Sequence, residues 1–290
     1  MESIHKILTP IDFSPASGDA ARYAAEIAPD LNAELTLLHV APPITFDFAM
    51  TQPASERFAE LTKHRHQTLR HAFDLFPPGQ ESLGPNVRRE VVEGDPAEEI
   101  LRRAHDHGYG LIVMPTRGSS PLRRWLVIGS VTSKVLHGAE CPVLAGTEFG
   151  KSYNPRQVRH ILSAVDLGPQ TERVLRWGAG LARHYGAPLT IVHAMPDAGA
   201  ANEDFFDPSW RSTLSGNLRE KIAGLMKANQ IEGDIAVESG DAHKVVASAA
   251  KRLEASVVVI GRGVSSDLLG RLRAQAYEII RRSPCPVLSV

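Results

Sequence analysis

Short runs of apolar residues alternate along the chain with longer stretches in which apolar residues recur every three or four positions. The short runs predict buried strands, and the longer periodic stretches predict amphipathic helices. In the first half, the predicted strands are 6–11, 35–40, 87–92, 110–114 and 142–145, and the predicted helices are 15–31, 58–76, 96–107 and 130–137. In the second half, the predicted strands are 160–165, 189–194, 235–238, 256–260 and 286–290.

The two halves of the chain repeat one pattern of residues. Asp12 recurs 154 residues later as Asp166, and the Cys-Pro-Val-Leu segment that begins at Cys141 recurs 144 residues later at Cys285. Solenoid repeats have periods of about 20–50 residues, so a repeat this long indicates two domains of one fold.

The order of the predicted elements indicates the fold class of each copy. Strands that alternate with helices favour an α/β fold, in which helices cover both faces of a parallel sheet. In such sheets, ligands bind beyond the carboxyl ends of the strands, where the strand order reverses. We expect the domains to span 1–147 and 157–290, on either side of a polar segment that contains glycine and proline.

Composition narrows the classes of protein to which the chain can belong. It has 290 residues, a formal net charge of −1 and two cysteines. Two cysteines cannot form a disulfide framework or a four-cysteine metal site, and they indicate a reducing compartment. The near-zero charge argues against a globally basic nucleic-acid-binding protein. No apolar run is long enough to span a membrane and no signal peptide is evident, so we expect a cytoplasmic protein.

The segment after the fourth strand has the pattern of a phosphate-binding loop. Gly118 lets the backbone approach a ligand closely, and Gly129 opens the next helix. The first N–H groups of a helix are unpaired and carry partial positive charge, which favours an anion. Ser130 and Thr132 add hydroxyl groups that can bond phosphate oxygen or reach a magnesium ion. The basic residues of the loop are Arg117, Arg123 and Arg124.

Residues at the ends of the first two strands complete the candidate site. Asp12 ends the first strand, where its carboxylate can accept hydrogen bonds from a ribose; the alternative is a turn or helix-capping role. Val40 ends the second strand and offers backbone groups and apolar surface to an adenine ring. His39 and His193 end equivalent strands, and we interpret them as polar residues near a pocket rather than as catalytic bases.

With these motifs, the chain resembles the universal stress protein family over nearly its whole length, as two tandem copies. The resemblance implies two flavodoxin-like, or adenine nucleotide α-hydrolase-like, domains, each with a five-stranded parallel sheet of order 3-2-1-4-5. It also implies ATP as the ligand of the first domain, with magnesium as a candidate companion. The residues carried over as nucleotide-binding are Pro10, Asp12, Val40, Met114, Pro115, Arg117, Gly118, Gly129, Ser130, Val131 and Thr132.

Both copies depart from the family's motif after the fourth strand, Gly-x2-Gly-x9-Gly-Ser/Thr. In the first copy, Pro115 stands at the first glycine, and ten residues instead of nine separate Gly118 from Gly129. The second copy has Arg273 in place of the last glycine and Ala274 in place of the following serine. We therefore expect a degenerate phosphate loop in the second domain and a mainly structural or regulatory role for that domain.

Other polar groups are better explained without catalysis or metal binding. His64, His66 and His71 lie on one predicted helix, but no cysteine or carboxylate is suitably spaced with them. A solvated helix face is therefore preferred to a metal site. Ser130 has no identifiable His–Asp partners, so no catalytic residue is predicted.

The matching strands that begin at Pro142 and Pro286 predict how the two copies associate. In the family that the chain resembles, the fifth strand is an exposed sheet edge that pairs antiparallel with its counterpart, and an unpaired edge promotes aggregation. We expect 142–145 and 286–290 to pair within one chain and form a pseudo-dimer. Whether pseudo-dimers pair further into homodimers stays open.

Three functions remain in competition at this point. The favoured one is an ATP-binding stress-response or signalling module whose state is read by an unknown protein partner. The second is a slow ATPase or nucleotide-dependent hydrolase. The third is a structural interaction module that binds no nucleotide.

Overall fold

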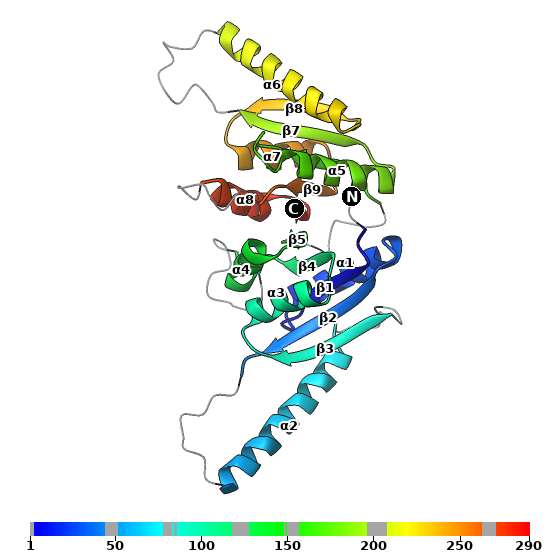
Figure 1. The fold of residues 1–290 in the computed structure, drawn as a ribbon, viewed down its shortest axis with the longest axis vertical. Helices are drawn as coiled ribbons and strands as arrows, with labels where there is room; N and C mark the ends of the chain where they lie inside the picture. The colour runs from blue at the N-terminus through cyan, green and yellow to red at the C-terminus, as the bar shows by residue number, and fades with distance from the viewer. Residues whose placement is uncertain are drawn as a thin grey trace. The chain divides into compact units, whose positions relative to one another are not determined.

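The computed structural model describes residues 3–43, 52–77, 83, 86–117, 128–147, 149, 157–195, 208–262 and 271–290, and of 52–59, 66, 208–210 and 271–274 it describes the backbone alone. The chain forms two compact units, 3–141 and 142–290. Figure 1 labels the elements of both units along the chain. Each unit is described by itself below.

The first unit is an α/β unit with a parallel sheet. Its sheet has the order β3-β2-β1-β4 and all three pairings are parallel. Its elements are β1 (Lys6–Pro10), α1 (Pro15–Asp30), β2 (Glu34–Ala41), α2 (Gln52–Asp74), β3 (Val87–Glu93), α3 (Pro96–Asp106), β4 (Leu111–Pro115) and α4 (Ser130–Gly138). Helix α1 packs against β1, β2 and β4, whereas α3 and α4 pack against each other.

The second unit repeats this arrangement and adds one antiparallel strand. Its sheet has the order β8-β7-β6-β9-β10, the predicted order 3-2-1-4-5, and β5 pairs antiparallel with β10. Its elements are β5 (Val143–Gly146), β6 (Ile161–Ala164), α5 (Thr171–Tyr185), β7 (Leu189–Met195), α6 (Pro208–Ala228), β8 (Asp234–Ser239), α7 (Ala242–Arg252), β9 (Val257–Ile260), α8 (Arg271–Arg282) and β10 (Val287–Ser289).

The strand register reproduces the repeat that the sequence predicts. Ile7 pairs with Leu35 in the first unit, and Ile161 pairs with Leu189 in the second, with the same offset of 154 residues. Strands β4 and β9 are buried along their whole length. Strands buried on both faces need apolar side chains on both faces, which explains why they appear in the sequence as unbroken apolar runs.

Local signals set the helix starts in the first unit. Ser14 caps α1 by accepting a hydrogen bond from the Ser17 N–H, and Pro15 follows at the first helical position, as predicted. Asp95 caps α3 by accepting from the N–H groups of Ala97 and Glu98. Helix α2 begins at Gln52, six residues before the predicted start at 58. The sequence missed these residues because they are mostly polar and carry no apolar periodicity.

The strand β5 belongs to the first copy in sequence but groups with the second compact unit. The units divide between Cys141 and Pro142, and β5 pairs with β10 through Leu144 opposite Leu288. The limits 1–147 and 157–290 describe the copies in sequence and remain a prediction, as does the pseudo-dimer.

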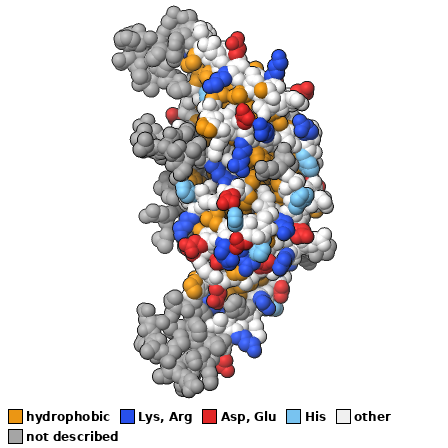
Figure 2. Space-filling model, in the orientation of Figure 1, with side chains coloured by type: hydrophobic (Ala, Val, Ile, Leu, Met, Phe, Trp, Pro, Cys, Tyr) orange, Lys and Arg blue, Asp and Glu red, His pale blue; other side chains and the backbone are white. Residues whose placement is uncertain are grey.

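The sequence predicts neither a membrane partner nor a metal site among its histidines, and the surface and helices of the described residues can be compared with that expectation. Figure 2 shows Lys and Arg side chains intermingled with Asp and Glu on the visible face. Among the described residues, no helix is both long enough and apolar enough to cross a membrane. The described part of the chain also holds no group of three or more His, Cys, Asp or Glu side chains that could bind a metal ion. Neither Cys141 nor Cys285 takes part in a disulfide within the described part of the chain.

Candidate functional site

A pocket of about 270 Å³ lies in the first unit, where β1, β2 and β4 end and α4 begins. Strand order reverses around β1, so this is the position at which parallel α/β sheets bind ligands. Nine of the eleven predicted site residues line it: Pro10, Asp12, Val40, Met114, Pro115, Gly129, Ser130, Val131 and Thr132. Arg117 is not among the lining residues. Gly118, Arg123 and Arg124 lie outside the described residues.

Asp12 takes part in the turn that leads from β1 into α1. Its Oδ1 accepts hydrogen bonds from the Ser14 backbone N–H at 3.0 Å and from the Ser14 hydroxyl at 2.5 Å. Phe13 between them has a φ of 61°, a left-handed conformation that is uncommon for a bulky residue. The turn role, which the sequence left as an alternative, is therefore present, and it holds an exposed carboxylate on the pocket wall.

His39 fixes the other side of this turn. Its Nδ1 lies 2.8 Å from the carbonyl oxygen of Ile11. A carbonyl oxygen only accepts hydrogen bonds, so Nδ1 carries the proton and donates, and Nε2 of the neutral ring is an acceptor. The ring also stacks at a tilt against Phe13, with centroids 4.5 Å apart. These contacts make His39 a strand-end residue that positions the turn next to the pocket.

The beginning of α4 closes the pocket on the phosphate-loop side. The Gly129 N–H donates to the Thr116 carbonyl at 2.9 Å, and the buried Thr132 hydroxyl donates to the Pro115 carbonyl at 3.1 Å. These two bonds tie the end of the loop back to its beginning. Side chains cap α1 and α3, whereas Gly129 provides α4 with no side-chain cap. Among the described residues, the first turn of α4 therefore receives no hydrogen bond from a capping side chain.

Sequence reasoning missed part of the pocket wall. Pro96 and Ile100, from the first turns of α3, also line it, as do Ser17 and Leu38. Parallel strands bring every following helix to the same edge of the sheet, so the start of α3 could have been included from topology alone.

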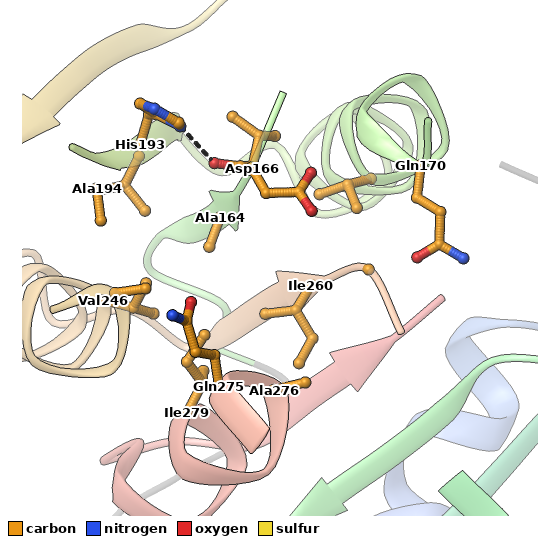
Figure 3. A pocket seen from close by; sticks show the side chains of 15 residues that line it. Ala164, Asp166, Gln170, His193, Ala194, Val246, Ile260, Gln275, Ala276 and Ile279 are labelled. Atoms are coloured by element: carbon orange, nitrogen blue, oxygen red, sulfur yellow. Dashed lines mark hydrogen bonds between the residues drawn. The ribbon is translucent and has the colours of Figure 1, made fainter. Parts of the chain in front are cut away.

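A second pocket, of about 310 Å³, lies at the equivalent strand ends of the second unit (Figure 3). The Asp166 Oδ1 accepts a hydrogen bond from the Gly168 N–H at 2.8 Å, and Leu167 has a φ of 60°. His193 Nδ1 lies 2.8 Å from the Val165 carbonyl oxygen. The turn with its aspartate and its histidine therefore has the same geometry in both copies.

The two pockets differ where the phosphate loop meets the helix. The first helical turn, Ser130-Val131-Thr132, corresponds to Ala274-Gln275-Ala276 when the copies are aligned on their Cys-Pro-Val-Leu segments. Gln275 and Ala276 line the second pocket, together with Gln170, which directly precedes α5. Neither glutamine was singled out from the sequence, because a lone glutamine forms no recognisable motif.

Comparison with known proteins decides the family. The model of the universal stress protein family matches residues 3–145 and 157–290. The chain belongs to the universal stress protein family. A universal stress protein of Methanocaldococcus jannaschii is 34% identical over 139 residues, which cover 48% of this chain and 79% of that protein. One from Mycobacterium tuberculosis is 26% identical over 282 residues, covering 94% of this chain and 92% of that protein.

Solved structures of universal stress proteins support the fold. A crystal structure from Archaeoglobus fulgidus matches with a TM-score of 0.62 and 24% identity, covering 98% of this chain and 95% of that chain. Two other solved members of the family are complexes with cAMP and with dAMP, at TM-scores of 0.33 and 0.35, and those ligands are properties of those proteins.

Proposed function

We propose that this universal stress protein is a cytoplasmic stress-response or signalling module that binds ATP in its first domain, with a protein partner that reads the bound state. The observation that carries the proposal is the first pocket, in which an apolar wall and an exposed carboxylate lead to a helix start without a side-chain cap. The pairing of β5 with β10 supports the further proposal of a pseudo-dimer.

The wall of the pocket suits the nucleoside part of ATP. Val40, Met114 and Ile100 present aliphatic and thioether surface, on which a flat heterocycle can pack. Asp12 lies at the rim, and a carboxylate there accepts hydrogen bonds from ribose hydroxyls. The turn bonds from Ser14 hold this carboxylate in place before any ligand arrives.

The start of α4 suits the phosphates. The helix dipole places roughly half a positive charge at its N-terminus, and the backbone N–H groups of the first turn point outward along the helix axis. The Ser130 side chain is exposed and its hydroxyl can bond a phosphate oxygen. A magnesium ion bound with ATP would be held chiefly by the phosphates, because magnesium keeps several waters and few protein ligands.

Calorimetric titration with ATP tests the proposal, with an expected stoichiometry of one ATP per chain. Ser130→Asp should weaken ATP binding by about tenfold or more, because a carboxylate at the first helical position repels phosphate, although it suits the helix dipole. Binding of adenosine to the first pocket should change little. The matched control is Ala274→Asp, the equivalent position in the second copy, which should leave the ATP affinity unchanged.

Two outcomes would contradict the proposal. One is the absence of both binding heat and thermal stabilisation by ATP, because a ligand that binds only the native state must stabilise it. The other is an equal loss of ATP affinity in Ser130→Asp and Ala274→Asp, which would remove the distinction between the two loops.

A further inference from the structure

The second pocket has no ligand under the proposed function, yet it keeps half of the architecture of the first. Asp166, Leu167 and His193 reproduce the aspartate turn and its histidine, with the same 2.8 Å bond from Nδ1 to a backbone carbonyl. The turn holds the Asp166 carboxylate exposed at the pocket rim. The part of the site that would contact a sugar is therefore retained.

The rest of the polar wall has changed from hydroxyl groups to amides. Figure 3 shows the Gln170 and Gln275 side chains on different sides of the pocket, with Ile260 between them. Gln275 is the fifth residue of α8, in its second turn, and aligns with Val131 of the first copy. Each amide offers donors and an acceptor but no charge, which suits the edge of a neutral heterocycle.

The approach of Gln170 depends on a glycine. A Cβ at Gly261 would lie 2.7 Å from the Gln170 Oε1 and 3.2 Å from the Gln170 Cβ, so a larger residue there would displace the amide. By strand register, the first copy has Pro115 there. The second copy thus has glycine where the first has proline at the end of the fourth strand, and the Gln170 amide, from the residue before α5, lies beside that glycine.

The remainder of the wall is aliphatic and fits a flat ring. Val174, Val246 and Ile279 line the pocket from three different helices, and Ile260 lines it from β9. Thr132, which helps close the loop in the first copy, corresponds to Ala276, so the hydroxyl that ties the loop to the strand end is missing here.

We propose that the second domain binds an uncharged purine nucleoside and selects it over the corresponding nucleotide. The choice of a nucleoside rests on the proposed function, because Asp166 and the aliphatic wall match the nucleoside part of the first pocket. The amides replace the phosphate-binding part and add contacts to the base. The two domains then respond to the phosphorylated and the unphosphorylated form of one kind of molecule.

The test is titration of adenosine into the full chain saturated with ATP, so that the first pocket is already filled. We expect one further adenosine per chain, with AMP binding to this site at least about tenfold more weakly. Gln275→Val, which installs the residue of the first copy, should weaken adenosine binding at least about tenfold, because a polar edge of the base loses its partner. Ala276→Leu, which fills the pocket from the same helix turn, should do the same.

Arg282→Gln, at an exposed position of the same helix outside the pocket, is the control and should leave this second binding event unchanged. Because the Gln275 side chain is exposed, its replacement should keep the thermal unfolding midpoint close to that of the wild type. The proposal is overturned if adenosine does not bind, if AMP binds as tightly, if two ATP bind per chain, or if Gln275→Val binds adenosine normally. If no ATP binds at all, the proposed function fails, and an adenosine site sensitive to Gln275→Val still supports this inference.

Discussion

The two pockets share one half and differ in the other. Both hold an aspartate on a left-handed turn, fastened by a histidine that donates to the backbone of the strand end. They differ in the following helix, which carries Ser130 and Thr132 in its first turn in one copy and Ala274 and Ala276 at the aligned positions in the other. The sheet therefore preserves the position of a site, while one helical turn determines its chemistry.

The largest expected effects come from the cores that hold the two pockets. Ile7 and Ile161 are equivalent residues, both fully buried in the central strands β1 and β6. Replacing either by alanine should lower the free energy of unfolding of its own unit by about 2–5 kcal/mol. Urea unfolding followed in each variant would measure this, and a loss below 1 kcal/mol in one copy only would break the equivalence of the cores.

A smaller effect should separate the two copies at the helix that covers the central strand. In the second unit, a Cβ at Gly178 would lie 1.9 Å from the Ser163 Oγ, whereas the first copy has Ala24 and Thr9 at these positions. Gly178→Ala should cost about 1–3 kcal/mol through overpacking, even though alanine favours the helix.

The double variant Ser163→Ala/Gly178→Ala should recover most of this loss, because it removes the crowded hydroxyl. The Ser163 hydroxyl is also buried without a hydrogen-bond partner among the described residues, so its removal carries little penalty. Thermal unfolding of the single and double variants would show the recovery. A double variant no more stable than Gly178→Ala alone would show that the clash is not with this hydroxyl.

The smallest expected effect concerns the caps of α3 and α7. Asp95 accepts hydrogen bonds from two backbone N–H groups, whereas its counterpart Asp241 forms no side-chain cap and instead pairs with Lys244 at 2.7 Å. Asp95→Ala should lower the unfolding midpoint of its unit by about 2–4 °C, and Asp241→Ala by less.

The effect of Asp95 should depend on pH. The backbone hydrogen bond from Glu98, and secondarily the charge of Lys134, lower the pKa of Asp95 from its ordinary value of 3.8. Because the folded pKa is lowered, the carboxylate stabilises the fold above pH 3.8, and this contribution is lost as the pH falls through the lowered value. Melting curves of the wild type and Asp95→Ala should therefore converge in acid; a difference that stays constant to the lowest pH would contradict the cap.

Most of the framework was predictable from the sequence, because it depends on local and periodic signals. The apolar runs located the strands, the repeat gave the two copies, and Ser14 and Asp95 gave the helix starts. The early start of α2 at Gln52 was not predictable, because polar helical turns lack periodicity. Nor was the grouping of β5 with the second unit, because contact density depends on the folded chain.

The candidate site was predictable where motifs report it and not elsewhere. A glycine before a helix start and an aspartate at a strand end are recognisable, and nine such residues converge on one pocket. The hydrogen bond from Thr132 to Pro115 was not, because the sequence suggested a ligand for that hydroxyl and not a backbone carbonyl. The proximity of Gln170 to Gly261 was not predictable either, because these residues are far apart in sequence and meet only in the folded protein.

The pairing of β5 with β10 has a consequence for the order in which the protein is made. Leu144 leaves the ribosome 144 residues before its partner Leu288, a delay on the order of ten seconds at common rates of synthesis. Until then the nascent chain holds β5 without its antiparallel neighbour, which leaves a strand edge open to association with other chains. Completion of this short antiparallel ribbon is thus a late step of biogenesis.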